Sequence, residues 1–330
     1  MKRSALLAVL ALGATLVATS ASAQTVWKMA TKMPPDGPEG KVFQYFADQA
    51  AKHSGGKIKV QVFPNEQLGK EAAVLEQLKM GTVQLYAEGS TFMEKWVPAI
   101  RWTTSGFLFK DRDHWVRFMN SPLITGMFEE AKQKAGISIL GDQTGVLRGP
   151  YRVLLAQEPI ATPADLSKVK LRMANSKSGV DQWKYLGAEV RVLGWAETYE
   201  SIGRGVVNAV TSPIALVESM KFYEVAKHIT RTDEYWQSIA FMMNQKAFDS
   251  LDKAGQKALL DAHADAAAYS IKLMQEVVNE SIGRMKAKGA VYHEVNLAPF
   301  IERMQSYYKE AEAAGELPKG FLETVAATAR

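Results

Sequence analysis

Strand-like and helix-like segments alternate in the first part of the chain, between residues 26 and 86. The residue pattern predicts strands at 26–30, 57–63 and 83–86. Apolar residues at helical spacing predict helices at 41–53 and 70–80, each followed by glycine. This order favours an α/β sheet with helices on its faces. Ligands of such sheets bind at the carboxyl ends of the strands.

A second series of alternating strand-like and helix-like segments begins near residue 150. Strands are expected at 150–156, 170–173, 189–192 and 206–210. Helical segments are expected between them, at 163–166, 180–186 and 196–202. A chain of 330 residues suits one large or two medium domains. The two sets of signals therefore favour two lobes, and the strand at 150–156 is expected to cross from one lobe to the other.

The last third of the chain carries an unusually long helical pattern, from residue 253 to residue 288. A single helix of that length would extend for about 50 Å at 1.5 Å per residue, enough to back both lobes. The alternative is two helices broken near Ala268 or Gly283. We expect the single helix.

The first residues have the features of a secretory signal peptide. A positive start at residues 1–3 precedes an apolar run at 5–17, and Ala21-Ser22-Ala23 supplies small residues for cleavage near Ala23. A membrane anchor is the weaker alternative, because the run is short and no other segment approaches a span. Residues 1–23 are thus predicted to be removed on export to the periplasm.

Cysteine is absent, which excludes disulfides, thiolate metal sites, cysteine nucleophiles and a lipid anchor on cysteine. The formal net charge of +5 falls to +3 when Lys2 and Arg3 are removed, since 38 basic residues then face 35 acidic ones. A charge so close to neutral and so evenly spread does not indicate nucleic acid as a partner.

The sequence carries none of the common catalytic motifs. The sequence contains no His-Glu-x-x-His, P-loop, G-x-G-x-x-G or G-x-S-x-G string. The five histidines are scattered beside charged residues, and each is expected at the solvent surface: His53, His114, His228, His263 and His293. We therefore expect no enzymatic activity, no cofactor and no bound metal.

The stretch 158–176 carries the main candidate for binding. Arg172 stands where an apolar strand gives way to a polar turn that includes Asn175. An arginine fork can hold a carboxylate with two parallel hydrogen bonds, although an arginine after a strand is more often part of a surface ion pair. Arg152 and Trp195 belong to the same lobe, and Glu88 follows the third strand as a rim residue or as a loop carboxylate in water.

The mature sequence as a whole resembles the solute-binding subunits of TRAP transporters, the DctP family. The resemblance rests on a series of short motifs in the same order and spacing: 62–69, 106–109, 158–160, 163–166, 169–173, 186–188, 195–199 and 205–208. It implies an α/β, two-lobed, periplasmic-binding-protein-like fold with a hinge, crossing strands and a long C-terminal helix spanning both lobes. The first lobe is expected to comprise 24–149 plus about 238–277, and the second 150–237 plus about 278–330.

The resemblance also implies roles for single residues. Arg172, in a Lys-x-Arg motif, is expected to form a salt bridge with the ligand carboxylate, with Arg152 as a second arginine. Glu88 corresponds to a pocket acid, and Trp195 takes the place of a pocket aromatic that is commonly phenylalanine. Ser212 stands where the family usually has a ligand-binding asparagine, and we add Asn175 as a further candidate. Thr211 replaces an acid, so a metal-bridged ligand is not expected.

The function implied is a monomeric periplasmic receptor that captures a small carboxylate by lobe closure and delivers it to the membrane subunits of a TRAP permease. Two alternatives are a receptor of the same ligand class that signals to a sensor, and an exported enzyme on a similar fold. The sequence leaves the ligand open among C4-dicarboxylates, other hydroxy or oxo acids, sugar acids and aromatic acids.

Overall fold

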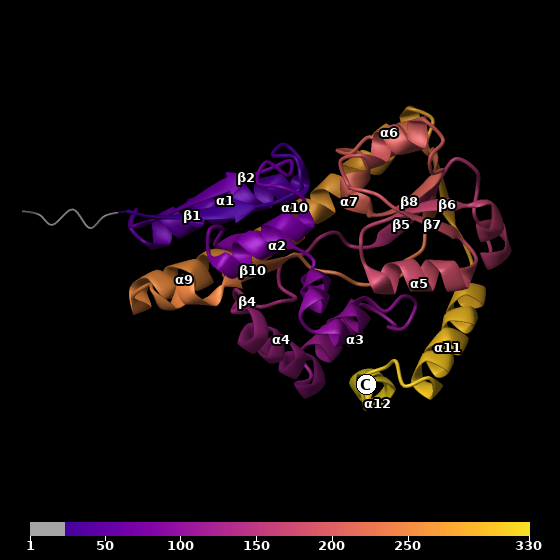
Figure 1. Cartoon of the computed structure of the whole chain (residues 1–330). Coiled ribbons are helices and arrows are strands. Elements are labelled where there is room, and N and C mark those ends of the chain that lie inside the picture. The colour runs from indigo at the N-terminus through magenta and orange to yellow at the C-terminus, as the bar shows by residue number, and fades with distance from the viewer. Residues whose placement is uncertain (1–23) are drawn as a thin grey trace, which may run out of the picture.

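The computed structural model describes residues 24–330, so the predicted signal peptide at 1–23 lies outside the described residues. Two β-sheets form the centres of two lobes that lie side by side, with one long helix running past both (Figure 1). Within residues 24–330, no helix combines the length and the apolar character needed to cross a membrane.

The first lobe is built on a five-stranded sheet in the order β2-β1-β3-β10-β4. Its strands are β1 (Thr25–Ala30), β2 (Ile58–Phe63), β3 (Leu85–Glu88), β4 (Ile137–Ile139) and β10 (Ala240–Asn244). The first three are parallel, and β10 is inserted antiparallel between β3 and β4.

Helices cover both faces of this sheet. The aromatic side chains of α1 (Pro38–His53) pack against Phe241 of β10 on one face, together with the first turns of the long helix α10. The other face is covered by α2 (Glu71–Met80) and α4 (Pro122–Ala135). The remaining helices of this lobe are the short η1 (Ser90–Lys95), η2 (Pro98–Thr104), α3 (Arg112–Met119) and α9 (Gln245–Asp249).

The second lobe is built on a six-stranded sheet in the order β11-β9-β5-β8-β6-β7. Its strands are β5 (Arg152–Ala156), β6 (Lys170–Met173), β7 (Glu189–Val192), β8 (Ala209–Pro213), β9 (His228–Arg231) and β11 (Val291–Glu294). The pairs β8–β6, β6–β7 and β11–β9 are parallel, whereas β5 is antiparallel to both β8 and β9. Its helical segments are η3 (Pro163–Lys168), α5 (Lys177–Leu186), α6 (Thr198–Gly203), α7 (Ile214–Val217) and α8 (Phe222–Val225).

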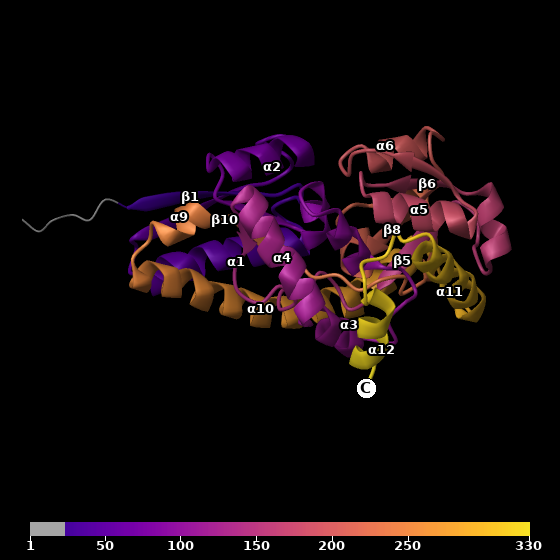
Figure 2. The same cartoon turned by 60° about the horizontal axis from the view of Figure 1, so that its bottom comes forward.

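Two chain crossings and one long helix join the lobes, and the segment between the last two helices connects them again near the end of the chain. The crossing segments run antiparallel and meet at a bridge between Leu147 and Ser238. The predicted long helix is confirmed as one continuous element, α10 (Lys253–Ala287), which packs along α1 and reaches α7 (Figure 2). Ser270, near its middle, accepts a 2.8 Å hydrogen bond from the backbone N–H of Leu147. The crossing is thus attached to the helix where the lobes meet.

The chain ends with two helices that contact different lobes. Helix α11 (Ala298–Ala313) packs on α5 of the second lobe, and α12 (Phe321–Thr328) packs on α3 of the first. The side chain of Arg117 in α3 donates a 2.7 Å hydrogen bond to the carbonyl of Thr328. The lobe boundaries given above stay a prediction.

Three sequence-based expectations need correction. Strands β3 and β8 begin two and three residues later than the predicted 83–86 and 206–210, because turn residues occupy the earlier positions. His114 and His263 are buried instead of solvent-exposed. His114 lies 2.8 Å from the carbonyl of Val325, and His263 packs edge-on against Phe241, where burial lowers its pKa to about 4.

Candidate functional site

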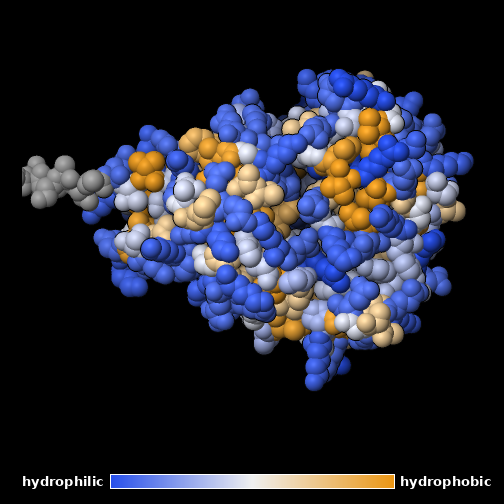
Figure 3. Space-filling model, viewed as in Figure 1, coloured by the Kyte–Doolittle hydropathy of each residue, from blue (hydrophilic) through white to orange (hydrophobic). Residues whose placement is uncertain are grey.

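A cavity of about 90 Å³ lies between the two lobes. This is space for several waters or a small organic molecule. Both sheets and both crossings contribute to its walls, and the surface near the cleft is hollowed between the two halves of the molecule (Figure 3). Its charged lining residues are Lys32, Glu88, Arg148, Arg152, Arg172 and Glu234.

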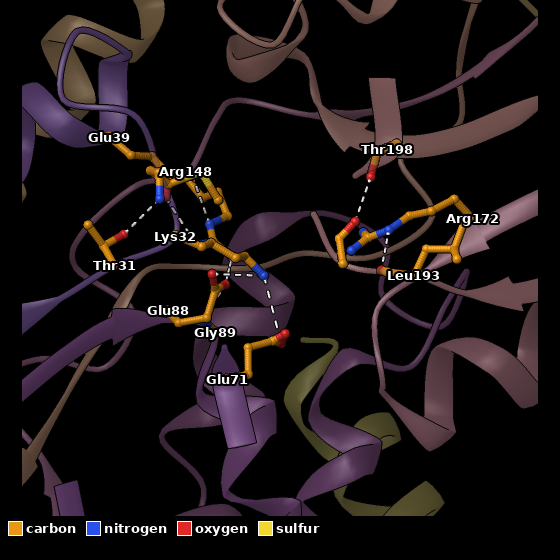
Figure 4. Close-up of polar contacts among 12 residues, drawn as sticks. Thr31, Lys32, Glu39, Glu71, Glu88, Gly89, Arg148, Arg172, Leu193 and Thr198 are labelled. Atoms are coloured by element: carbon orange, nitrogen blue, oxygen red, sulfur yellow. Dashed lines mark hydrogen bonds and ion pairs between the residues drawn. The ribbon is translucent and has the colours of Figure 1, made fainter. Parts of the chain in front are cut away.

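On the first-lobe side, the cavity is bordered by a buried network of charges (Figure 4). Lys32 follows β1 and Glu88 ends β3, and the carboxyl ends of parallel neighbouring strands meet at one edge of the sheet. Lys32 Nζ lies 3.0 Å from Glu88 Oε2. Arg148, on the first crossing, pairs with Glu88 and also with Glu39 of α1, at 3.0 Å between Nε and Oε1.

This network holds Glu88 as a carboxylate. Burial opposes ionisation of Glu88, but the charges of Arg148 and Lys32 outweigh burial and lower the pKa of Glu88 to about 2. Glu88 also accepts a 2.8 Å hydrogen bond from the backbone N–H of Gly89. The two cations on this side of the cavity are therefore already neutralised by the protein.

On the second-lobe side, Arg152 is likewise paired. It is the first residue of β5, and its Nε donates a 2.8 Å hydrogen bond to Glu234 Oε1. Its Nη2 donates to the hydroxyl of Thr211 at 3.1 Å, and its guanidinium stacks 4.1 Å from the centre of the Tyr235 ring. Arg152 therefore belongs to a complete internal ion pair.

Arg172 differs from the other cations on the cavity. It lies in β6 and is 5% exposed, and its Nε donates a 2.9 Å hydrogen bond to the carbonyl of Leu193. Among residues 24–330, no carboxylate lies within ion-pairing distance of its guanidinium, and no hydrogen bond engages its terminal nitrogens. Burial lowers its pKa to about 10 and the charge of Glu71 opposes the shift, so the side chain remains a cation at neutral pH.

Trp195 forms the wall beside this arginine. The guanidinium of Arg172 lies 5.2 Å from the centre of the Trp195 ring, and Lys32 Nζ lies 6.0 Å from it. The same ring packs edge-on against Phe222 at 5.0 Å. The turn before the tryptophan is fixed by a 3.1 Å hydrogen bond from the hydroxyl of Thr198 to the carbonyl of Gly194 (Figure 4). The indole Nε1 is buried without a hydrogen-bond partner.

The structure brings four of the six candidate residues to this cavity: Glu88, Arg152, Arg172 and Trp195. Ser212 does not line it, because β8 places Thr211 and Pro213 on the cavity and turns Ser212 to the opposite side, level with Val153. Its hydroxyl is fully buried and donates to the carbonyl of Pro213 at 2.9 Å. Asn175 lies at the mouth of the cleft with Glu71 and Val192, outside this cavity.

Sequence reasoning missed several lining residues, above all Lys32, Arg148 and Glu234. One signal was available for Lys32, which stands two residues after the predicted first strand at 26–30, as Glu88 stands two residues after the predicted third strand at 83–86. Arg148 also precedes a predicted crossing strand by only a few positions. No local pattern identifies Glu234, since its contact with Arg152 joins residues 82 positions apart.

The arrangement is suited to binding an anion. Among the described residues, no histidine lines the cavity, and no group of three His, Cys, Asp or Glu side chains is placed to hold a metal. A buried guanidinium without a counter-ion, next to an aromatic wall, can accept a carboxylate in a bidentate pair.

Comparison with known proteins agrees with this geometry. The model of the DctP family, described as bacterial extracellular solute-binding protein, family 7, matches residues 29–314. A solute-binding protein of Roseobacter denitrificans is 29% identical over 255 residues, which cover 77% of each chain. The C4-dicarboxylate-binding periplasmic protein DctP of Rhodobacter capsulatus is 27% identical over 295 residues, or 88% of this chain and 86% of that one.

Among solved structures, a TRAP periplasmic solute-binding protein from Ochrobacterium anthropi with bound L-fuconate superposes with a TM-score of 0.84. It is 28% identical, and the match covers 93% of this chain and 100% of the other. The two-lobed fold and the resemblance derived from the sequence are both confirmed. The chain therefore belongs to the DctP family of bacterial extracellular solute-binding proteins, the periplasmic small-acid receptors of TRAP transporters.

Proposed function

We propose that this protein captures a hydroxylated monocarboxylate in the cavity between its lobes, with Arg172 as the residue that binds the carboxylate. One observation carries the proposal. Of the four cations that line the cavity, Lys32, Arg148 and Arg152 each pair with a glutamate, whereas Arg172 pairs with none among the described residues. A buried unpaired charge is unfavourable, and an anionic ligand relieves that cost.

The same charge pattern argues for one carboxylate in the ligand. A second carboxylate on a short dicarboxylic acid would face cations that Glu88 and Glu234 already neutralise. It would gain little attraction there and would lose its hydration. We therefore expect C4-dicarboxylates to bind more weakly than monocarboxylates.

Two buried polar groups on the cavity favour hydroxyl groups elsewhere in the ligand. The Thr91 hydroxyl and the Trp195 Nε1 are both buried without a hydrogen-bond partner in the protein. Unsatisfied buried groups of this kind cost about 1–3 kcal/mol each, which ligand hydroxyls would recover. The relative that binds L-fuconate makes a polyhydroxy acid the first choice.

Capture and delivery follow from the architecture as further parts of the proposal. Two crossings and α10 join the lobes and leave them able to rotate around a ligand held between them. We propose that residues 1–23 direct export and are cleaved near Ala23, and that the monomeric closed form delivers its acid to the membrane subunits of a TRAP permease. No turnover of the acid is expected.

A thermal-shift screen followed by calorimetry tests the ligand class. The panel should contain L-fuconate, D-gluconate, D-glucuronate, succinate and benzoate, and we expect the hydroxylated monocarboxylates to give the largest shifts. Arg172→Met should then weaken the best acid by about 30-fold to several thousand-fold, as expected when a buried charged pair loses one partner. The proposal is wrong if Arg172→Met binds that acid as tightly as wild type.

Trp195 supplies a second readout. Its ring lies on the cavity next to Arg172, so binding should change tryptophan fluorescence, and Trp195→Phe should remove much of that change. A fluorescence response that is unaltered in Trp195→Phe would place the acid elsewhere.

A further inference from the structure

Glu71 is a carboxylate beside the ligand cavity that the binding scheme above does not use. It is the first residue of α2 and lies at the mouth of the cleft with Phe92, Asn175 and Ser176. Its Oε1 is buried and has no hydrogen-bond partner. The nearest cation is Lys32, at 3.9 Å between Nζ and Oε1 (Figure 4). The carboxylate of Glu71 therefore has one distant ion-pair partner and no short one among the described residues.

Charged groups from both lobes act electrostatically on Glu71. The charged groups that act on it are Lys32, Glu66, Glu88 and Arg172. Of the two cations among them, Lys32 is closer to Glu88, at 3.0 Å, and Arg172 has no counter-ion of its own. Among the negative charges that favour the protonated form of Arg172, the charge of Glu71 has the largest effect.

The other charged residues at the cleft mouth have partners elsewhere. Glu94 Oε1 accepts a 3.3 Å hydrogen bond from the backbone N–H of Lys177, whose side chain pairs with Asp181 at 2.6 Å, while Glu94 Oε2 is buried without a hydrogen-bond partner. Lys95 pairs with Glu76 on the solvent side of α2. Glu71 is thus the carboxylate of the mouth that lies beside Lys32 of the cavity wall, and the charge of Arg172 also acts on it.

Burial raises the pKa of Glu71, and the positive charges of Lys32 and Arg172 limit that rise. A ligand carboxylate on Arg172 would cancel part of that positive field and add a like charge nearby. Both changes favour the protonated form of Glu71. Glu88 is held ionised by two cations, and both oxygens of Glu39 contact Arg148, whereas Glu71 has only Lys32 at 3.9 Å.

We propose that Glu71 takes up a proton when an acid binds to Arg172, so that the receptor captures its carboxylate together with one proton. The proposal rests on the proposed role of Arg172. The balance is simple: a solvent proton adds to Glu71, no covalent bond of the ligand changes, and the total charge of the closed cleft is unchanged by capture. In the empty site, the carboxylate of Glu71 therefore balances part of the positive charge of Lys32 and Arg172. When the acid binds, the ligand carboxylate takes over that role and Glu71 becomes neutral.

Calorimetry tests this coupling with the best-binding acid of the panel above, L-fuconate being tried first. Binding enthalpies measured at one pH in phosphate and in Tris differ in proportion to the protons taken up. Wild type should take up a substantial fraction of one proton. Its affinity should fall as pH rises, by up to about ten-fold per pH unit where uptake is complete. Glu71→Gln should remove the uptake and flatten the pH dependence without weakening binding.

Glu76→Gln is the matched control, because Glu76 lies on the same helix but faces solvent and pairs with Lys95. It should take up protons as wild type does. Carbon-13 NMR of the glutamate carboxyls in the unmutated protein gives a readout that does not depend on a variant folding. The Glu71 resonance should titrate at a higher pH when the acid is bound.

The outcomes separate the two proposals. If wild type takes up no proton between pH 5 and 8 and Arg172→Met abolishes binding, Glu71 is uninvolved and the carboxylate role of Arg172 stands. If uptake persists in Glu71→Gln, another group takes the proton and the inference is overturned. If Arg172→Met binds normally, the proposed function itself has failed.

Discussion

Arg172→Met should change stability and ligand binding in opposite directions. In the empty protein Arg172 is a buried cation with no acidic partner among the described residues. Methionine has a similar length, carries no charge and packs well on an aromatic ring such as Trp195. The variant should therefore bind the acid poorly and yet fold more stably than wild type.

The size of the effect follows from the geometry. Lowering the pKa of Arg172 from its ordinary value to about 10 corresponds to roughly 3 kcal/mol against folding. Because the group is a cation whose pKa is lowered, this cost is present at all pH values below about 10 and declines above that. The variant also loses the hydrogen bond to Leu193, worth about 1 kcal/mol. A net gain of about 2 kcal/mol remains, a few degrees in Tm for a chain of this size.

Urea unfolding of the ligand-free proteins, followed by tryptophan fluorescence and circular dichroism at pH 7.5, measures this gain. Arg191→Met is the matched control: Arg191 is level with Arg172 on the neighbouring strand, but it is only half-buried and pairs with Glu189 at 2.7 Å. It should change neither stability nor binding appreciably. A clear loss of stability in Arg172→Met would refute the claim that its burial is costly, whatever the variant does to binding.

Three further variants test other parts of the structure. Glu234→Gln leaves Arg152 buried without its carboxylate, so the free energy of unfolding in urea should fall by about 3–5 kcal/mol; an unchanged value would mean that the pair contributes nothing. The lowered pKa of Glu88 contributes roughly 3 kcal/mol above about pH 4.5, which is lost as pH falls toward 2. Glu88→Gln should flatten that fall in acid unfolding curves, and a curve as steep as wild type would contradict the assignment. Gly283→Ala should raise stability by about 0.5–1 kcal/mol, because the added methyl group meets no atom within 4 Å and alanine favours the helix; destabilisation would show that α10 is strained there.

Much of the fold could be predicted because local patterns determine it. The strand at 170–173 and the strand at 189–192 have the predicted bounds, since glycine and polar turns delimit them closely. The long helix is continuous through Gly283 because its apolar face packs on both lobes, a tertiary contribution that outweighs the low helix propensity of glycine.

The site was harder to predict for two physical reasons. Successive side chains of a strand point to opposite faces of the sheet. The start of β8 was predicted three residues too early, so the sequence did not show whether Thr211 or Ser212 faces the cavity. Ion pairs join distant parts of the chain, and sequence alone could not show that Arg152 has a partner and Arg172 has none. The arginines look alike in sequence and differ only through their neighbours in space.

The insertion of β10 between β3 and β4 has a consequence for how the chain matures. The first sheet cannot close until residue 244 has been made, although its other strands are complete by residue 139. At about 5–20 residues per second, translation of the intervening stretch of roughly 100 residues takes on the order of 5–20 s. The second sheet waits in the same way for β11, close to the end of the chain. Neither half can therefore complete its native hydrogen bonding early in synthesis.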